Sequence, residues 1–294
     1  MIISRKEVSA LSADIRKIID GHTVDLRDNL EGRLSTLKND IHTLAGRLNE
    51  QAENLQKEKA AMANTLADIS HQLKTPLTAM TVMVELLENA PPDKRAEFIA
   101  NLKQGLTQTE WLANALLKMA KLESGSAVFS PVYIQAHELV DAALAPLRIL
   151  LDIKDQRVSL AGEALLYCDK NWTAEAITNI VKNASEHSPE GGIIEIAVGS
   201  NPISNWISVT DSGQGIPAAE IKDLFKRFGG SRKGIGIGLA LALAIMRGQG
   251  GDIEVNGGGK NYGDLNHGGY DEDSGRSATH RGAIFTFKFY AKGG

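Results

Sequence analysis

The sequence is short of the features that mark secreted, membrane-spanning and nucleic-acid-binding proteins. It has a single cysteine, Cys168, so no intramolecular disulfide can form, and we expect this residue to be small and buried beside a strand. No run of about 18 apolar residues occurs, so we expect no membrane-spanning helix, and the early charges of MIISRKEV do not fit a secretory signal. A net charge of −4 gives no basic surface for nucleic acid. The stretch is therefore expected to be soluble and to bind no nucleic acid.

What the sequence does contain is a long helical repeat in its first third. Between residues 30 and 73 the apolar residues recur mostly in alternating steps of four and three, with a weak point at Gln51 and Glu58. The residues of this seam are Leu30, Leu34, Leu37, Ile41, Leu44, Leu48, Leu55, Met62, Leu66, Ile69 and Leu73. The heptad spacing predicts a coiled coil or a helical bundle, and the alternative is one long helix packed on its own domain.

A shorter helix precedes the seam. Residues 5–19 look helical, and DGHTVDLRDN (20–29) breaks the pattern with Gly21 and several Asp and Asn residues. A second helix then opens near Glu31 and Gly32. This order of helix, connector and helix resembles a HAMP-type signalling linker.

A second long helix is predicted after the seam. The pair Pro91-Pro92 marks a stop, and a helix is expected from about Asp93 to Leu122. Its apolar side consists of Phe98, Leu102, Leu106, Leu112, Leu116 and Met119. Two long helices joined by a short turn make an antiparallel hairpin, and pairing of two chains into a four-helix bundle would bury the apolar sides.

The composition changes near ESGSAVFSP (123–131), where we place a domain boundary. Beyond it, strands are predicted at RVSL, ALLYC, IIEIAV, WISVT, DIEV and AIFTFKFY. Helices are expected at about 134–151, 170–187, 217–225 and 237–248. The sequence therefore predicts an α/β domain with a mixed or mostly antiparallel sheet.

The segment DISHQLKTPLTAM (68–80) places a histidine ahead of a proline inside the long helix. A helix turns by about 100° per residue, which puts His71 on the side opposite the apolar seam and Thr75 nearly in line with it. A proline in a helix interior costs roughly 3 kcal/mol. A lone surface histidine usually has no function, so the interpretation of His71 depends on motifs further along the chain.

Four such motifs follow one another between residues 179 and 242. NIVKNASEHS carries Asn179 and Asn183 on one face of a helix, and DSGQGIP joins an acid to glycines that let backbone approach a ligand. LFKRFGG comes next, followed by GIGIGLALA, where glycines precede a helix whose N-terminal amides favour a phosphate group. One such motif could be an ordinary turn, but all four in this order are hard to explain as turns and favour a site for a phosphate group.

Residues 60–290 resemble the cytoplasmic core of a sensor histidine kinase. SHQLKTPL resembles its H box, NIVKNA its N box, DSGQGIP and GIGIGLAL its two glycine boxes, and LFKRF its F box. The resemblance implies an α + α/β fold, in which a dimeric four-helix bundle precedes a two-layer α/β sandwich of the gyrase/Hsp90/MutL type. The expected domains are a HAMP-like or coiled-coil linker at 1–57, a dimerisation and phosphotransfer hairpin at 58–126, and an ATP-binding domain at 127–294.

The resemblance also implies roles for single residues in binding ATP. Asp211 would accept a hydrogen bond from the adenine amino group, and Gly213 and Gly215 would let the chain pass against the base. Asn179 and Asn183 would face the phosphates, with the second as the Mg²⁺ ligand. The residues expected to wrap the phosphates are Gly234, Gly236 and Gly238. Phe225 and Phe228 are expected to pack at the base of the lid.

By the same resemblance, His71 is the acceptor of the γ-phosphoryl group and passes it to an aspartate of a response regulator. Asn179 stands where related ATPases have a glutamate that activates water, so transfer to water is disfavoured. Thr75 matches the position that orients water when such kinases dephosphorylate the regulator. We further hypothesise that Pro76 permits a local bend. The protein would be a homodimer and the cytoplasmic portion of a cell-membrane protein, attached through a segment absent from this chain.

Four departures from the family pattern leave alternatives open, and one of them is a short lid between Phe228 and Gly234. Gln72 follows His71 where an acid is usual, and Glu186 stands where a lysine is common, so that Lys182 or Lys233 would have to compensate. A Gly-, Asn- and Asp-rich stretch at 256–282 replaces a tight hairpin and is expected to be a mobile loop, although its histidines and aspartates could bind a metal. The alternative function is a degenerate ATP-binding scaffold, or a phosphatase-dominant protein with weak autokinase activity. A gyrase-type ATPase clamp is disfavoured by Asn179 and the His71 helix.

Overall fold

The computed structural model describes most of the chain. The described residues are 5–19, 22, 25, 33–88, 90–228, 236–258 and 282–290. They form two compact units, Met1–Ser70 and His71–Gly294, which are described separately. Most of the predicted connector at 20–29 and of the long loop at 256–282 lies outside the described residues. None of the described helices is long and apolar enough to cross a membrane.

The first unit is helical. It contains α1 (Arg5–Ile19), at the bounds that the sequence predicted, and the first part of α2 (Arg33–Glu88). Along this part of α2 the seam side chains Leu37, Leu44, Leu48, Leu55, Met62 and Leu66 are 48–66% exposed. One chain by itself therefore leaves the predicted heptad seam uncovered, and the coiled coil stays a prediction.

The second unit begins with the helical hairpin. α2 runs through Pro76 without interruption and ends at Glu88, and α3 (Pro92–Glu123) begins with a proline in its first turn, where no backbone donor is needed. The predicted stop at Pro91-Pro92 is therefore confirmed. A Cβ atom on Gly105 would lie 2.8 Å from the Met80 side chain, so the two helices pack closely at this level.

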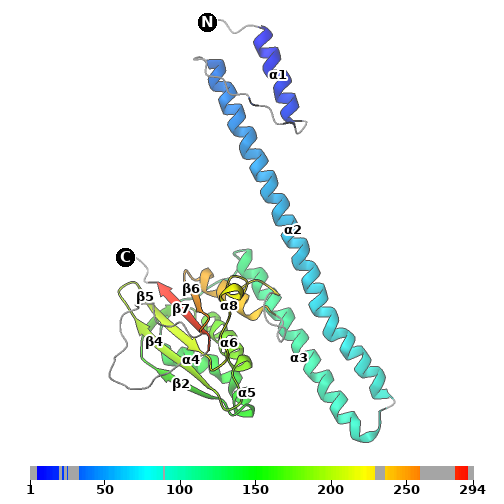
Figure 1. The fold of residues 1–294 in the computed structure, drawn as a ribbon, viewed down its shortest axis with the longest axis vertical. Coiled ribbons are helices and arrows are strands. Elements are labelled where there is room, and N and C mark those ends of the chain that lie inside the picture. The colour runs from blue at the N-terminus through cyan, green and yellow to red at the C-terminus, as the bar shows by residue number, and fades with distance from the viewer. Residues whose placement is uncertain are drawn as a thin grey trace. The chain divides into compact units, whose positions relative to one another are not determined.

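The α/β domain follows and contains two sheets, and Figure 1 labels the strands of the larger one. A small one pairs β1 (Val132–Gln135) with β3 (Leu165–Cys168). The larger one has the order β2-β4-β5-β7-β6, formed by β2 (Arg157–Ala161), β4 (Ile193–Ser200), β5 (Ser204–Thr210), β7 (Ile284–Tyr290) and β6 (Asp252–Asn256). β2 and β4 are parallel and the other pairs antiparallel, so the predicted mixed sheet is confirmed.

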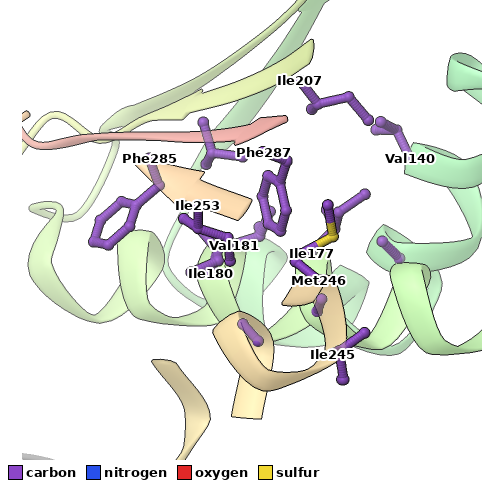
Figure 2. Packing of buried hydrophobic residues seen from close by; sticks show 14 of the residues in the cluster. Val140, Ile177, Ile180, Val181, Ile207, Ile245, Met246, Ile253, Phe285 and Phe287 are labelled. Carbon is purple, nitrogen blue, oxygen red and sulfur yellow. The ribbon is translucent and has the colours of Figure 1, made fainter. Parts of the chain in front are cut away.

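Helices cover one face of the larger sheet. They are α4 (Ala136–Leu144), a short 3₁₀ turn (Ala145–Leu147), α5 (Arg148–Ile153), α6 (Lys170–His187) and α8 (Gly238–Gly248). A further single turn, α7 (Ala218–Ile221), has no buried residue. Figure 2 shows Phe285 and Phe287 of β7 meeting Ile177 and Ile180 of α6 in the core, where all four are fully buried. This layer fixes α6 and α8 against the sheet, which matters because both carry predicted site residues.

Two helix predictions differ from the structure. The helix predicted at 134–151 is divided, because residues 132–135 pair with β3 and Pro146 lies in a 3₁₀ turn between α4 and α5. The helix predicted at 217–225 is the single turn α7. Cys168 is buried at the end of β3, as predicted, and its burial raises the pKa of the thiol.

Candidate functional site

The residues predicted around the histidine lie on α2. His71 is exposed, as the helical pattern predicted, Gln72 is half-buried, and Leu73 turns inward and packs against the core of the second unit. The Thr75 hydroxyl donates a hydrogen bond of 3.2 Å to the His71 carbonyl, so in this conformation it is directed at the helix backbone. Because His71 is exposed, its imidazole is accessible.

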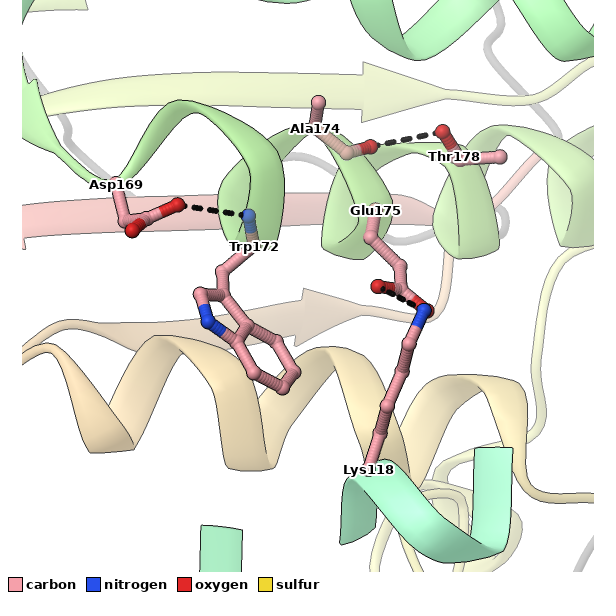
Figure 3. Close-up of polar contacts among 6 residues, drawn as sticks. All are labelled: Lys118, Asp169, Trp172, Ala174, Glu175 and Thr178. Atoms are coloured by element: carbon pink, nitrogen blue, oxygen red, sulfur yellow. Dashed lines mark hydrogen bonds and ion pairs between the residues drawn. The ribbon is translucent and has the colours of Figure 1, made fainter. Parts of the chain in front are cut away.

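The other predicted residues gather around α6, whose N-terminus is firmly anchored. The buried Asp169 carboxylate accepts hydrogen bonds from the backbone N–H groups of Asn171 and Trp172 at 2.9 and 3.0 Å, which is an N-cap (Figure 3). Its other oxygen accepts the Ser130 N–H at 2.8 Å, which ties the segment after α3 to the domain.

The two asparagines of α6 lie one turn apart on the face toward α8. Asn179 is buried and Asn183 is half-buried. A Cβ atom on Gly238, the first residue of α8, would lie 3.3 Å from the Asn179 side-chain oxygen. The absence of a side chain at Gly238 therefore lets the start of α8 come close to the asparagine face of α6, which brings two of the predicted motifs together.

The loop after β5 brings a buried acid beside the end of α6. Asp211 is 5% exposed, and its Oδ1 accepts the Gly213 N–H at 2.8 Å. Burial raises the pKa of this carboxyl group, against the lowering effect of the hydrogen bonds and of the charge of His187. A Cβ atom on Gly213 would lie 2.7 Å from the His187 carbonyl oxygen, so this close approach requires glycine.

Positive backbone dihedrals explain two more of the predicted glycines. Gly215 and Gly236 have φ angles of 77° and 71°, which side chains rarely tolerate. The N–H of Phe228 donates to the Gly236 carbonyl at 2.9 Å, and Phe225 and Phe228 are half-buried against the core. Their place at the base of a lid stays a prediction. The remaining predicted residues of this segment, Gly234 and Lys233, lie outside the described residues.

Lys182, one of the two lysines predicted to compensate for Glu186, contacts a side chain of α3. Its Nζ lies 5.0 Å from the centre of the Trp111 ring, within the range of a cation–π contact, and 4.0 Å from Glu186. A second contact between α3 and α6 was not predicted from the sequence. It is an ion pair in which Lys118 of α3 donates to both carboxylate oxygens of Glu175 at 2.6 and 2.7 Å (Figure 3).

These contacts dock α3 on the α/β domain. Leu112, Ala115 and Met119 of α3 are buried in the same core as α8, and Glu123 forms an ion pair with Arg227 of the LFKRF motif. The apolar period of α3 predicted Leu112 and Met119 as inward-facing, but it gave no signal of what would cover them.

The residues gathered around α6, which are Asp211 after β5, the two asparagines of α6 and the start of α8, have the chemistry to bind an adenine nucleotide. A buried carboxylate beside a glycine that admits close backbone approach can recognise an amino-substituted base, and side-chain amides next to a helix N-terminus can face phosphates. Asn183 offers the oxygen ligand that Mg²⁺ prefers. Within the described ranges no cluster of His, Cys, Asp and Glu could hold a metal, and the alternative metal site at 256–282 falls almost wholly outside them. Among the described residues, no hydrogen bond or ion pair joins His71, Gln72 or Thr75 to Asp211 or to the two asparagines of α6.

Comparison with known proteins gives two matched families. Residues 61–125 match the His Kinase A (phospho-acceptor) domain, and residues 168–292 match the Histidine kinase-, DNA gyrase B-, and HSP90-like ATPase family. The first match covers the hairpin with His71, and the second covers the sheet with Asp211 and both asparagines.

Similar proteins agree with both matches. The heme sensor protein HssS of Staphylococcus saprophyticus is 27% identical over 66% of this chain and 42% of its own length. The histidine-protein kinase/phosphatase MprB of a Mycobacterium species is 27% identical over 64% of this chain and 38% of its own length. The chain thus spans less than half the length of these relatives.

A solved structure shares the fold. Histidine kinase ThkA, in complex with the response regulator protein TrrA, superimposes with a TM-score of 0.61 at 18% identity and covers 83% of this chain and 66% of its own.

The ATPase match also implies that the α/β domain binds ATP. With a phospho-acceptor domain and an ATPase domain in this order, the chain belongs to the sensor histidine kinases of two-component systems.

Proposed function

We propose that this chain is the kinase core of a sensor protein, which transfers the γ-phosphoryl group of ATP to His71 and then to an aspartate of a response regulator. The observation that carries the proposal is the combination, in one chain, of an exposed histidine on a helical hairpin with a buried acid and a glycine-lined approach on a sheet domain.

Each residue of the α/β domain has a role in this proposal. Asp211 would accept the adenine amino group, with Gly213 and Gly215 beside the base. Asn179, Asn183 and the glycines before and at the start of α8 would face the phosphates. Bound Mg²⁺ would offset the phosphate charge, and we assign the Asn183 amide oxygen as its protein ligand.

The acceptor chemistry follows from the imidazole. A neutral ring nitrogen of His71 forms the bond to the γ-phosphorus while the bond to the leaving oxygen of ADP breaks. Asn179 has no carboxylate to activate water, which favours the histidine as acceptor. Gln72 can hydrogen-bond the ring but cannot take up its proton, so a Gln72→Glu substitution is expected to raise the rate of autophosphorylation.

The phosphohistidine needs an acceptor, and the partner we propose is a response regulator. The structural relative ThkA carries one in its complex, and the relative MprB is named both kinase and phosphatase. We accordingly assign to Thr75 the orientation of water during dephosphorylation of the regulator, which requires its hydroxyl to leave the His71 carbonyl. The functional unit would be a homodimer, and use of ATP places it on the cytoplasmic side.

The proposal is tested with ATP labelled at the γ-phosphate and Mg²⁺. The purified chain should gain acid-labile, alkali-stable label, and His71→Ala should abolish it. His137→Ala removes an exposed histidine from α4 and serves as the matched control that keeps the label. Tight ATP binding without label on the unsubstituted chain, or label that persists in His71→Ala, would contradict the assignment.

A further inference from the structure

A buried glutamine closes the C-terminal end of α6. Gln156 lies just before β2 and is 7% exposed. Its side-chain nitrogen donates to the carbonyls of Ser185, Ser188 and Pro189 at 3.1, 3.2 and 3.0 Å, and its oxygen accepts the Ser185 hydroxyl at 2.6 Å. A single side chain therefore holds four groups of residues 185–189.

The chemistry of a helix end explains why an amide suits this position. The last carbonyls of a helix have no partner within it and carry partial negative charge. Lys154 reaches one of them, with its Nζ donating to the Ser185 carbonyl at 2.7 Å. A glutamine supplies further donors without the cost of burying a charge, and it also accepts from the Ser185 hydroxyl, which is fully buried.

The segment that Gln156 holds is the one on which the candidate adenine loop rests. The Ser188 hydroxyl accepts the Ser212 N–H at 3.1 Å, and the His187 carbonyl lies against Gly213. Ser212 follows the buried Asp211 directly. The contacts thus run without a gap from Gln156, through the end of α6, to Ser212 and Gly213, the two residues that follow Asp211 in its loop.

We propose that Gln156 is a positioning residue for adenine recognition, which acts through Ser188 and the end of α6 to hold the Asp211 loop in place. The proposal rests on the ATP binding proposed above and extends it to a residue that touches no nucleotide. Loss of the amide frees the backbone of residues 185–189, and the Asp211 carboxylate then loses its fixed direction toward the base.

The test compares Gln156→Met, which keeps the length of the side chain but removes its donors, with Gln249→Met. Gln249 holds the opposite end of α6, where its side chain accepts the Asp169 N–H at 2.7 Å and donates to Thr173 at 3.1 Å. Affinities for ATP and for GTP, whose base has an oxo group in place of the adenine amino group, are measured by calorimetry. Their ratio does not change when part of the protein unfolds, so it separates positioning from lost stability.

Gln156→Met is expected to weaken ATP binding by about 10-fold, the size of one lost buried hydrogen-bonding group, and to leave GTP binding nearly unchanged. Gln249→Met should keep the ATP to GTP ratio of the unsubstituted chain. Ser188→Ala removes the hydroxyl that accepts the Ser212 N–H and is a smaller change. If Gln156→Met does not fold, the ATP to GTP ratio of Ser188→Ala is measured in its place. An unchanged ratio in the folded Gln156 and Ser188 variants overturns the positioning role alone, whereas an unsubstituted chain that fails to bind ATP overturns the proposed function and this role with it.

Discussion

The adenine contact proposed for Asp211 would oppose the stability of the folded domain. The carboxylate is buried, and desolvation raises its pKa, so the empty domain bears the cost of an ionised group in a poorly solvated place. An acid with this shift contributes stability that is fully present below its unfolded-state pKa of about 3.9 and is lost as the pH rises through its folded-state pKa. The acid is therefore expected to be kept for adenine and not for folding.

Asp211→Asn is expected to make the nucleotide-free protein more stable at pH 7 and to remove its selectivity for ATP. The amide oxygen can still accept the Gly213 N–H, and no charge is buried. We expect the Tm of the α/β domain to rise by about 2–4 °C. Thermal unfolding between pH 4 and pH 7 checks the cause, because the difference from the unsubstituted chain should grow as the pH rises. A difference that stays constant over this range would refute the charge as its origin.

Single residues also show where a sequence is informative. The exposure of His71 followed from the angular period of a helix, and the glycines at 213, 215 and 236 followed from motifs whose backbone demands are local. Gln156 had no such signal, because its partners at 185–189 are distant in the sequence and meet it only when β2 pairs with β4. The same holds for the contact of Lys182 with Trp111.

At the scale of elements, the docking of α3 on α6 follows an antiparallel pattern. Trp111 and Lys118 lie seven residues apart on α3, and their partners Lys182 and Glu175 lie seven residues apart on α6 in the reverse order. Two turns of each helix therefore face each other, with one ion pair and one cation–π contact at the ends.

This pattern predicts that the charges of the ion pair can be exchanged. Lys118→Glu and Glu175→Lys should each lower the free energy of unfolding of the α/β domain by about 1 kcal/mol at most, since both side chains are partly exposed, and the double variant should recover most of the loss. Urea unfolding of the four proteins measures the coupling. Additive losses in the double variant would mean that the two side chains do not stabilise the docked α3.

The elements also show the limits of local patterns. α6, α8 and the strands of the larger sheet were predicted within about two residues, because their apolar periods are long and their ends carry turn residues. The helix predicted from about residue 134 includes the second half of β1, because these four residues form a strand only by pairing with β3, some thirty residues further along the chain. Short edge elements depend on partners that the local sequence does not name.

The assembly of the whole molecule depends on the uncovered apolar seam of α2. Six large apolar side chains between Leu37 and Leu66 are about half or more exposed within one chain. Burial of such a side chain is worth roughly 1.5–3 kcal/mol, so their exposure favours association through this face. The heptad spacing suits a second copy of the same helix better than a flat partner surface, because knobs at positions a and d fit holes made by the same repeat.

The seam therefore predicts a homodimer that one substitution weakens. Leu55→Asp places a charge in the middle of the seam and should raise the dissociation constant of the dimer by at least about 10-fold, the equivalent of 1.4 kcal/mol, since a buried leucine is worth more than this. Asn54→Asp introduces the same residue one position away, off the apolar stripe, and should leave the dimer intact. Sedimentation velocity over a range of concentrations measures both. If the two variants associate equally well, the seam is not the dimer contact, and the hairpin at residues 71–123 must supply it instead.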